Sequence, residues 1–156
     1  DVLRLAASAY SPVLKTLQYD RLAGLPYAAL PIATAVCLQN GQPMIYPRKE
    51  AKEYGTKAAI EGAYEAGETV ALIDDLATTG GAKFDAIEKL VEAGLKVKDV
   101  VVLIDRQSGA AETLAQAGYA LHAVFTLTQL LDYWEQKKEL PLAQIQAARD
   151  FLKGQA

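Results

Sequence analysis

Two neighbouring carboxylates stand just ahead of a cluster of hydroxyl and glycine residues in the middle of the chain. Asp74 and Asp75 follow the apolar residues 70–73, and residues 78–81 read Thr-Thr-Gly-Gly. Glycines let the main chain approach a ligand closely, and the first N–H groups of a following helix attract an anion. Carboxylates accept hydrogen bonds from hydroxyl groups. The order of residues therefore fits a ligand with a diol on one side and a phosphate on the other, such as ribose 5-phosphate.

An alternative interpretation of these residues needs no ligand. Asp74 and Asp75 would merely end a strand, and residues 78–81 would form a turn and a helix cap. We favour a ligand loop because the apolar run, the paired acids, the hydroxyls and the glycines follow in the order that such a loop requires. The motifs G-x-x-x-x-G-K-[ST] and G-x-G-x-x-G are absent from the sequence, which excludes a nucleoside triphosphate P-loop and a dinucleotide fingerprint.

The surrounding pattern predicts an α/β fold that places this loop at one edge of a parallel sheet. Residues 70–73 fit a short buried strand, and apolar residues recur at helical spacing from Phe84 to Val91. A strand, a helix and a strand over 69–73, 83–93 and 97–104 form a βαβ unit. Further helices are predicted over 2–17, 31–38, 112–117, 128–136 and 142–152, and further strands over 21–24, 43–46 and 121–125.

These elements add up to one domain, residues 1–156, with helices on both faces of the sheet. Ligands of such sheets bind beyond the carboxyl ends of the strands. We therefore expect the loop after Asp75, the turn after Gly24 and the pair Asp105-Arg106 to meet at the same edge.

The motif over residues 70–82 resembles the signature of type I phosphoribosyltransferases, which is four apolar residues, two acidic residues and a Thr/Gly loop. Residues 48–57 and 103–107 resemble the mobile catalytic loop and the base-binding segment of orotate phosphoribosyltransferases. Residues 26–31 are similar to the family's pyrophosphate-binding loop. The resemblance implies the type I phosphoribosyltransferase fold and transfer of a 5-phosphoribosyl group from phosphoribosyl pyrophosphate to orotate, as in UMP synthesis.

The resemblance also implies a set of site residues. Lys52, Asp74 and Asp75 would be catalytic, and Thr78 and Arg106 would contact orotate. The residues implied to bind phosphoribosyl pyrophosphate are Tyr27, Ala28, Arg48, Lys49, Lys52, Asp74, Asp75, Leu76, Ala77, Thr78, Thr79, Gly80, Gly81 and Ala82. Mg²⁺ would be needed, but it would be carried by substrate oxygens rather than by a protein cage.

Three of these assignments have structural alternatives. Residues 48–57 hold four cations and two anions, which would also suit a solvated helix face with Lys49–Glu53 and Glu53–Lys57 pairs worth ~0.3 kcal/mol each. The alternative for Arg106 is a solvated salt bridge with Asp105 or with a neighbouring helix. For residues 26–31 the alternative is an ordinary turn between a strand and a helix.

Family members are homodimers, and the resemblance implies that residues 48–57 of one subunit cover the other subunit's site. Those relatives begin with a further hood segment that encloses the base. We expect the hood to be missing here, either by truncation or because the chain is the phosphoribosyltransferase part of a fusion with orotidine-phosphate decarboxylase. The rival hypotheses are a phosphoribosyltransferase for another base, a non-catalytic regulator that binds phosphoribosyl pyrophosphate, and a receiver-like signalling domain.

Net charge, hydropathy and cysteine content limit the kinds of partner and compartment that we expect. The net charge of −3 argues against nucleic acid, and neither a membrane span nor a signal peptide is present in the sequence. Cys37 is the only cysteine and lies among apolar residues, which predicts a buried thiol in a reducing cytoplasm. His122, the only histidine, lies in a predicted strand and Trp134 in a predicted helix; we interpret both as structural.

Overall fold

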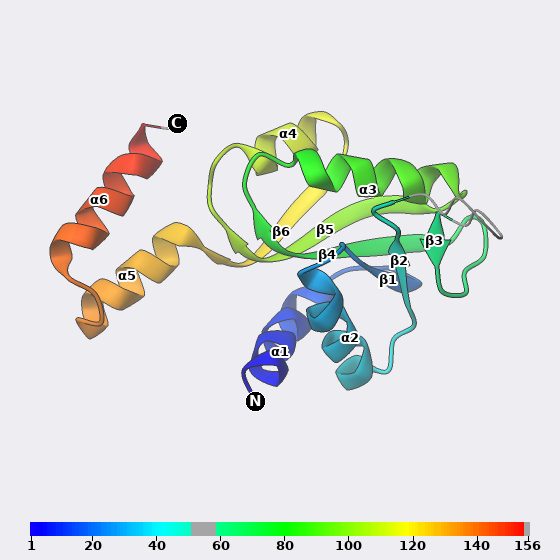
Figure 1. Ribbon diagram of the computed structural model, residues 1–156, viewed down its shortest axis with the longest axis horizontal. Helices are drawn as coiled ribbons and strands as arrows, with labels where there is room; N and C mark the ends of the chain where they lie inside the picture. Colours follow the sequence, from blue (N-terminus) through cyan, green and yellow to red (C-terminus); the bar gives the residue numbers. More distant parts are fainter. Residues whose placement is uncertain (51–58, 155–156) are drawn as a thin grey trace.

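The computed structural model describes residues 1–50 and 59–154, and these form a six-stranded sheet flanked by helices (Figure 1). The strands, in the spatial order β3-β2-β1-β4-β5-β6, are β1 (Arg21–Gly24), β2 (Met44–Pro47), β3 (Ile60–Glu61), β4 (Thr69–Ala77), β5 (Lys96–Asp105) and β6 (Ala120–Thr126). The helices are α1 (Val2–Leu14), α2 (Ala29–Asn40), α3 (Gly81–Glu92), α4 (Ala110–Gln116), α5 (Leu127–Lys137) and α6 (Leu142–Lys153).

The predicted fold class is confirmed. The β1–β2, β1–β4, β4–β5 and β5–β6 pairs are all parallel, and β2–β3 is antiparallel. Helices α1 and α2 cover one face of the sheet, and α3 and α4 cover the other (Figure 1). This two-layer cover explains why the middle of the sheet is apolar on both sides.

Strand β4 lies in the middle of the sheet and contributes side chains to the core on each face. Its residues Val70 and Leu72 pack into the core on the α3 side, whereas Ala71 and Ile73 pack into the core that contains Tyr10 of α1. All four strand residues are at most 1% exposed, and burying a side chain the size of Leu or Ile contributes about 1.5–3 kcal/mol. The continuous apolar run therefore anchors the segment that leads into the candidate loop.

Helix α2 packs closely against the end of β1, where the residue is a glycine. A Cβ atom on Gly24 would stand 2.9 Å from Cβ of Ala33 and 3.1 Å from Cδ2 of Leu30. Such contacts are too short for ordinary packing. Gly24 therefore brings the start of α2 close to the end of β1, beside the predicted pyrophosphate loop.

The sequence-based prediction missed the full length of one strand and the presence of another. Strand β4 was expected to end at Ile73 but continues to Ala77, because Leu76 and Ala77 pair with Ile104 and Asp105 of the long neighbour β5. Strand β3 was not predicted at all. It forms two residue pairs with β2, which is too short to leave a periodic pattern.

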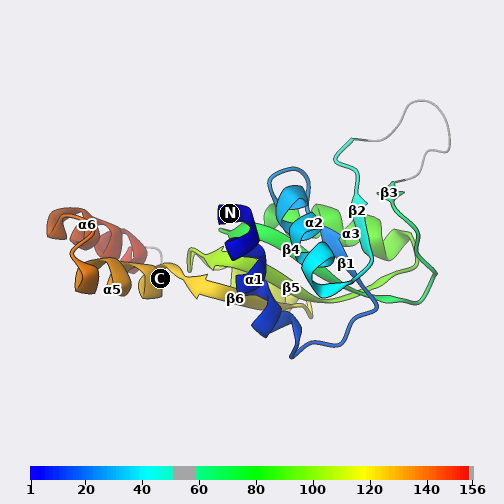
Figure 2. The same ribbon diagram turned by 90° about the horizontal axis from the view of Figure 1, so that it is seen from below.

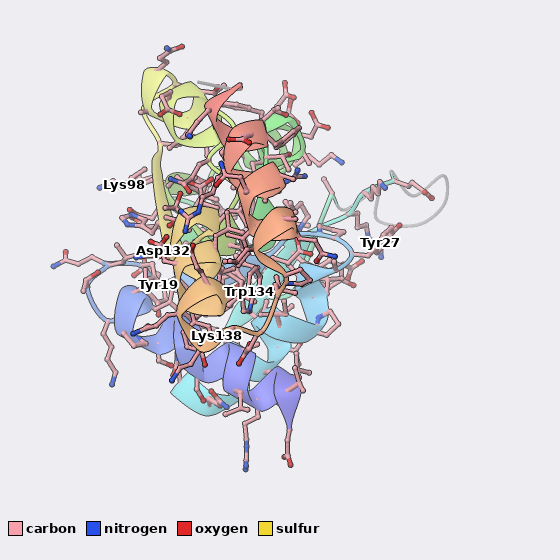
Figure 3. All side chains as sticks on the ribbon, turned by 90° about the vertical axis from the view of Figure 1, so that its left-hand side faces the viewer. Tyr19, Tyr27, Lys98, Asp132, Trp134 and Lys138 are labelled. Carbon is pink, nitrogen blue, oxygen red and sulfur yellow. The ribbon has the colours of Figure 1, made fainter. Side chains whose placement is uncertain are left out.

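The last two helices leave the body of the protein. Figures 1 and 2 show α5 and α6 as a hairpin that projects beyond β6 instead of covering the sheet. A capping box at Thr126 and Gln129 starts α5, and Arg149 of α6 binds both Asp132 and Glu135 of α5 at 2.7 Å. Figure 3 looks onto this end, with Trp134 on α5. Both helices were thus predicted from the sequence, and the structure shows that they lie beyond the sheet.

None of the described helices is long and apolar enough to cross a membrane.

Candidate active site

Three segments converge at the carboxyl edge of the central strands, as the sequence predicted. The N–H of Leu25, just after β1, donates to the carbonyl oxygen of Ile73 at 2.9 Å. On the other side of β4, the N–H of Arg106 donates to the carbonyl oxygen of Ala77 at 3.0 Å. The turn after β1, the end of β4 and the start of the β5–α4 loop therefore lie side by side.

The loop over residues 78–82 has the form of an anion cradle. Gly80 has a φ of +92° and occupies the N-cap of α3, a left-handed conformation that favours glycine. A Cβ atom on Gly81 would meet nothing within 4 Å. In the part of the chain that the structure describes, the N–H groups of residues 79–82 donate to no other protein group. Free amides at a helix N-terminus are what a phosphate group binds.

The two aspartates of the motif differ in environment. Asp75 is half-buried, whereas Asp74 is 7% exposed. Oδ2 of Asp74 accepts a hydrogen bond from Nζ of Lys83 at 2.7 Å, and Oδ1 accepts the N–H of Asp75 at 2.9 Å. Burial raises the pKa of Asp74, and the Lys83 ammonium opposes that shift. Asp75 is thus the acid that is open to a ligand.

Lys83 was not identified from the sequence. It lies in the first turn of α3, is 3% exposed, and also donates from Nζ to the carbonyl oxygen of Leu76 at 2.8 Å. Its place in the sequence, at the predicted start of a helix, could have identified it on electrostatic grounds. A cation is disfavoured at the positive end of a helix, so a lysine there needs a carboxylate nearby, and the motif supplies one.

Tyr10 supports the same aspartate from the opposite face of the sheet. Its hydroxyl donates to the carbonyl oxygen of Asp74 at 2.8 Å, and the side chain is fully buried. Burial, followed by the charges of Asp74 and Asp75, raises the pKa of Tyr10 well above its ordinary range. Buried tyrosines usually find a hydrogen-bond partner, but the sequence does not reveal which one.

The predicted catalytic loop, residues 48–57, is called the basic segment here, and the structure describes it only as far as residue 50. Arg48 forms an ion pair with Glu61 of β3, and Nζ of Lys49 lies 5.5 Å from the ring centroid of Tyr27. Tyr27 itself is 61% exposed and lies at the margin of the body (Figure 3). Lys52, the predicted catalytic lysine, lies outside the described residues.

Lys89 of α3 fixes the start of this segment. Its Nζ donates to the carbonyl oxygens of Arg48 and Lys49 at 2.7 and 3.1 Å. A pocket runs beneath these contacts, lined by Leu25, Pro26, Pro47, Arg48, Lys49, Ala82, Asp85, Ala86 and Lys89. The predicted pyrophosphate loop, the basic segment and the 78–82 loop therefore border a single pocket. Neither Lys89 nor Glu61 was identified from the sequence.

Arg106 lies next to the cradle. Among the described residues its side chain forms no ion pair, and Oδ1 of Asp105 accepts the N–H of Gln107 at 2.8 Å instead. The alternative pairing of Arg106 with Asp105 is therefore not observed. Ala77 and Asp105 are the last paired residues of β4 and β5, and Thr78 and Arg106 directly follow them.

Other predicted residues take up the following positions. Leu76 and Ala77 were placed in the loop but end β4, and Ala77 is fully buried, so only its main chain could reach a ligand. Nε2 of His122 lies 2.7 Å from Oδ1 of Asp99 on the neighbouring strand, which fits a structural role.

Cys37 is buried as predicted, and burial raises the pKa of its thiol to about 11. Among the described residues, no group of three His, Cys, Asp or Glu side chains could hold a metal ion.

A parallel sheet with an acidic pair and an amide cradle after β4, a basic segment after β2 and an arginine after β5 defines a phosphoribosyltransferase of type I. In a solved structure of UMP synthase from Leishmania donovani, 33% of the chain matches 98% of this one with a TM-score of 0.92 and 48% identity. Orotate phosphoribosyltransferase from Mycobacterium tuberculosis, solved in complex with 5-phospho-α-D-ribosyl 1-diphosphate, matches 82% of this chain and 75% of its own with a TM-score of 0.71 and 27% identity.

Sequence relatives identify the branch of that class. Orotate phosphoribosyltransferase from Thermococcus gammatolerans is 36% identical over 140 residues, which are 88% of this chain and 74% of the relative. Uridine 5′-monophosphate synthase from Bos taurus is 40% identical over 140 residues, 90% of this chain but 29% of the relative. The chain belongs to the orotate phosphoribosyltransferase family.

The chain spans less than a third of the bifunctional relatives that it matches. No family model matches it.

Proposed function

We propose that this protein transfers the 5-phosphoribosyl group of phosphoribosyl pyrophosphate to N1 of orotate, giving orotidine 5′-monophosphate and pyrophosphate. The observation that carries the proposal is one juxtaposition. Free amides of residues 79–82, the open carboxylate of Asp75 and the unpaired guanidinium of Arg106 border the same sheet edge within the described residues. The amides suit a phosphate, the carboxylate suits the hydroxyls of a diol, and the guanidinium suits the carboxylate of a base.

Residues of β4 and the cradle would hold the sugar. The 5′-phosphate would lie on the amides of residues 79–82, with the Thr79 hydroxyl as a further donor. The carboxylate of Asp75 would accept hydrogen bonds from the ribose hydroxyls and favour the positive charge that develops on the ring as the C1–O bond breaks. Asp74, whose oxygens already bind Lys83 and the N–H of Asp75, would mainly fix the position of Asp75.

Arg106 and Thr78 would hold the base. A planar guanidinium can grip the orotate carboxylate through two parallel hydrogen bonds. Thr78 and Arg106 directly follow Ala77 and Asp105, the last paired residues of β4 and β5, so orotate bound there would lie beside the ribose. N1 would then attack C1 as the pyrophosphate leaves with the electron pair of the broken bond, and the proton released from N1 would pass to the pyrophosphate or to water. No covalent enzyme intermediate is needed.

The leaving pyrophosphate would be held by Tyr27 and Ala28, through main-chain N–H groups, and by Arg48, Lys49 and Lys52. Charge grows on this group in the transition state, so cations that close over it would raise the rate more than the substrate affinity. Closure would also expel water from the pocket. For Arg48 this requires sharing its guanidinium with Glu61, its present partner.

Mg²⁺ fits this donor set. Asp75 offers carboxylate oxygens, the ligands that a hard cation prefers, beside the place proposed for the diol. Bound mainly to diol and pyrophosphate oxygens, Mg²⁺ would neutralise the charge of the leaving group. We further propose a homodimer with sites shared through residues 48–57, and we place the reaction in the cytoplasm because a single cysteine suits a reducing compartment.

The test is a spectrophotometric assay of orotate consumption. Adding phosphoribosyl pyrophosphate and Mg²⁺ should deplete orotate and release one pyrophosphate per orotate consumed. Adenine, hypoxanthine and xanthine serve as competing bases. Turnover of a purine without turnover of orotate would contradict the base assignment, and binding of phosphoribosyl pyrophosphate without any base-dependent pyrophosphate release would favour a regulator.

A further inference from the structure

A buried lysine joins the two ends of the cradle. Nζ of Lys83 contacts Oδ2 of Asp74 at 2.7 Å and the carbonyl oxygen of Leu76 at 2.8 Å. Both acceptors lie in β4, before the loop, whereas Lys83 lies in α3, after it. The two contacts therefore close residues 77–82 into a loop whose ends are held by a charged hydrogen-bonded group.

The position of Lys83 excludes a direct contact with a ligand. The residue is 3% exposed, and the side chains of Lys83 and Asp74 in this pair are 4% and 10% exposed. Its ammonium points back to β4 rather than out to the free amides of the cradle. Any effect on a bound phosphate must therefore pass through the shape of the loop or through the charge of Asp74.

The charge of Asp74 matters because the cradle must accept an anion close to two acids. Asp75 has no ion-pair partner among the described residues, while Asp74 is paired with Lys83. Pairing leaves one uncompensated carboxylate at the site instead of two. A buried charge that loses its partner acts strongly on its surroundings, because little water screens it.

We propose that Lys83 is a positioning residue, which holds the 78–82 loop in the shape that binds the 5′-phosphate and cancels the negative charge of Asp74 beneath it. This inference rests on the proposed function of the loop. It assigns a role in binding the phosphosugar, not the base, to a side chain that touches neither.

The experiment titrates ribose 5-phosphate into the full chain by calorimetry, in wild type, Lys83→Met, the double variant Lys83→Met with Asp74→Asn, and Lys98→Met. Lys83→Met should weaken binding at least about tenfold. The double variant should bind more tightly than Lys83→Met, because the carboxylate left without a partner is gone. Lys98→Met, the same change at an exposed lysine of β5, should bind like wild type.

Steady-state kinetics give a second readout that a merely structural role would not move. In Lys83→Met the KM for phosphoribosyl pyrophosphate should rise, while the KM for orotate stays at the wild-type value. A folded Lys83→Met that binds ribose 5-phosphate like wild type would overturn the proposal, and so would a double variant that binds no better than Lys83→Met.

If Lys83→Met does not fold, the double variant takes its place, because it leaves no buried charge unpaired. The N–H groups of residues 83 and 84 donate to the carbonyl oxygen of Gly80 in the wild type. Their hydrogen exchange in the double variant should be at least about tenfold faster than in wild type, and unchanged exchange would count against a clamp. A wild-type protein that binds ribose 5-phosphate but consumes no orotate would contradict the proposed reaction alone, since the ranking of the variants is measured without orotate.

Discussion

Adjacent residues of the same type can carry different duties, as Asp74 and Asp75 illustrate. Asp74 faces α3 and is locked by Lys83, whereas Asp75 remains open at the sheet edge. The sequence predicted that this pair marks a sugar phosphate site. It did not distinguish the two acids, because the distinction depends on a lysine nine positions later that reaches back across the loop.

Substitution of the two aspartates should separate stability from activity. Asp74→Asn leaves the Lys83 ammonium buried without its partner, so it should lower the free energy of unfolding by about 3–5 kcal/mol. Asp75→Asn should leave stability nearly unchanged but reduce kcat/KM for phosphoribosyl pyrophosphate at least about tenfold. Urea unfolding and steady-state kinetics measure both effects. Equal losses of stability in the two variants would contradict the assignment.

Cys37 should be unreactive in the folded protein. Burial raises the pKa of its thiol from 9.0 to about 11, which lowers the thiolate fraction at neutral pH roughly 100-fold, and the thiolate is the nucleophile. Alkylation by iodoacetamide at fixed pH should therefore be at least that much slower in native buffer than in urea. Similar rates in the two conditions would show that the thiol is accessible.

At the scale of elements, the sequence predicts the helices and strands that have a clear apolar pattern, and it misses those that depend on pairing with a neighbour. The βαβ unit around the cradle was predicted because its strands are continuous apolar runs and the apolar residues of its helix recur at helical spacing. The extension of β4 to Ala77 follows from pairing with β5, and β3 consists of two residues; neither leaves a periodic signal. Amphipathicity predicted α5 and α6 but not that they turn away from the sheet.

The α5–α6 hairpin should open independently of the sheet. Leu131 and Ile145 are its buried residues, at 3% and 2% exposure. Ile145→Ala should cost about 2–5 kcal/mol of local stability, and hydrogen exchange should accelerate in α5 and α6 while amides of β4 keep their wild-type rates. Equal acceleration in β4 would show that the hairpin and the sheet unfold as one unit.

At the scale of the whole molecule, the strands bring distant residues to one edge of the sheet. The proposed site also needs residues of the basic segment. The cradle, Asp75 and Arg106 come from the described chain, whereas Lys52 lies outside the described residues. The proposed homodimer places the basic segment over the neighbouring subunit. Sequence resemblance supplied that arrangement, because a single chain carries no direct signal for it.

Mixing two inactive variants tests this arrangement. Lys52→Ala removes a cation from the basic segment, and Asp75→Ala removes the open acid, so a shared site would contain both wild-type residues in some mixed dimers. Activity of the mixture should exceed that of either parent. A mixture no more active than its parents would argue that each subunit completes its own site.

The central claim is that the loop between β4 and α3 is a cradle for the phosphate of a ribose whose hydroxyls bind Asp75. The most direct measurement is a crystal structure of the protein soaked with phosphoribosyl pyrophosphate. We predict the 5′-phosphate on the amides of residues 79–82 and the ribose hydroxyls at the carboxylate of Asp75. A donor bound elsewhere, with these amides unoccupied, would contradict the account.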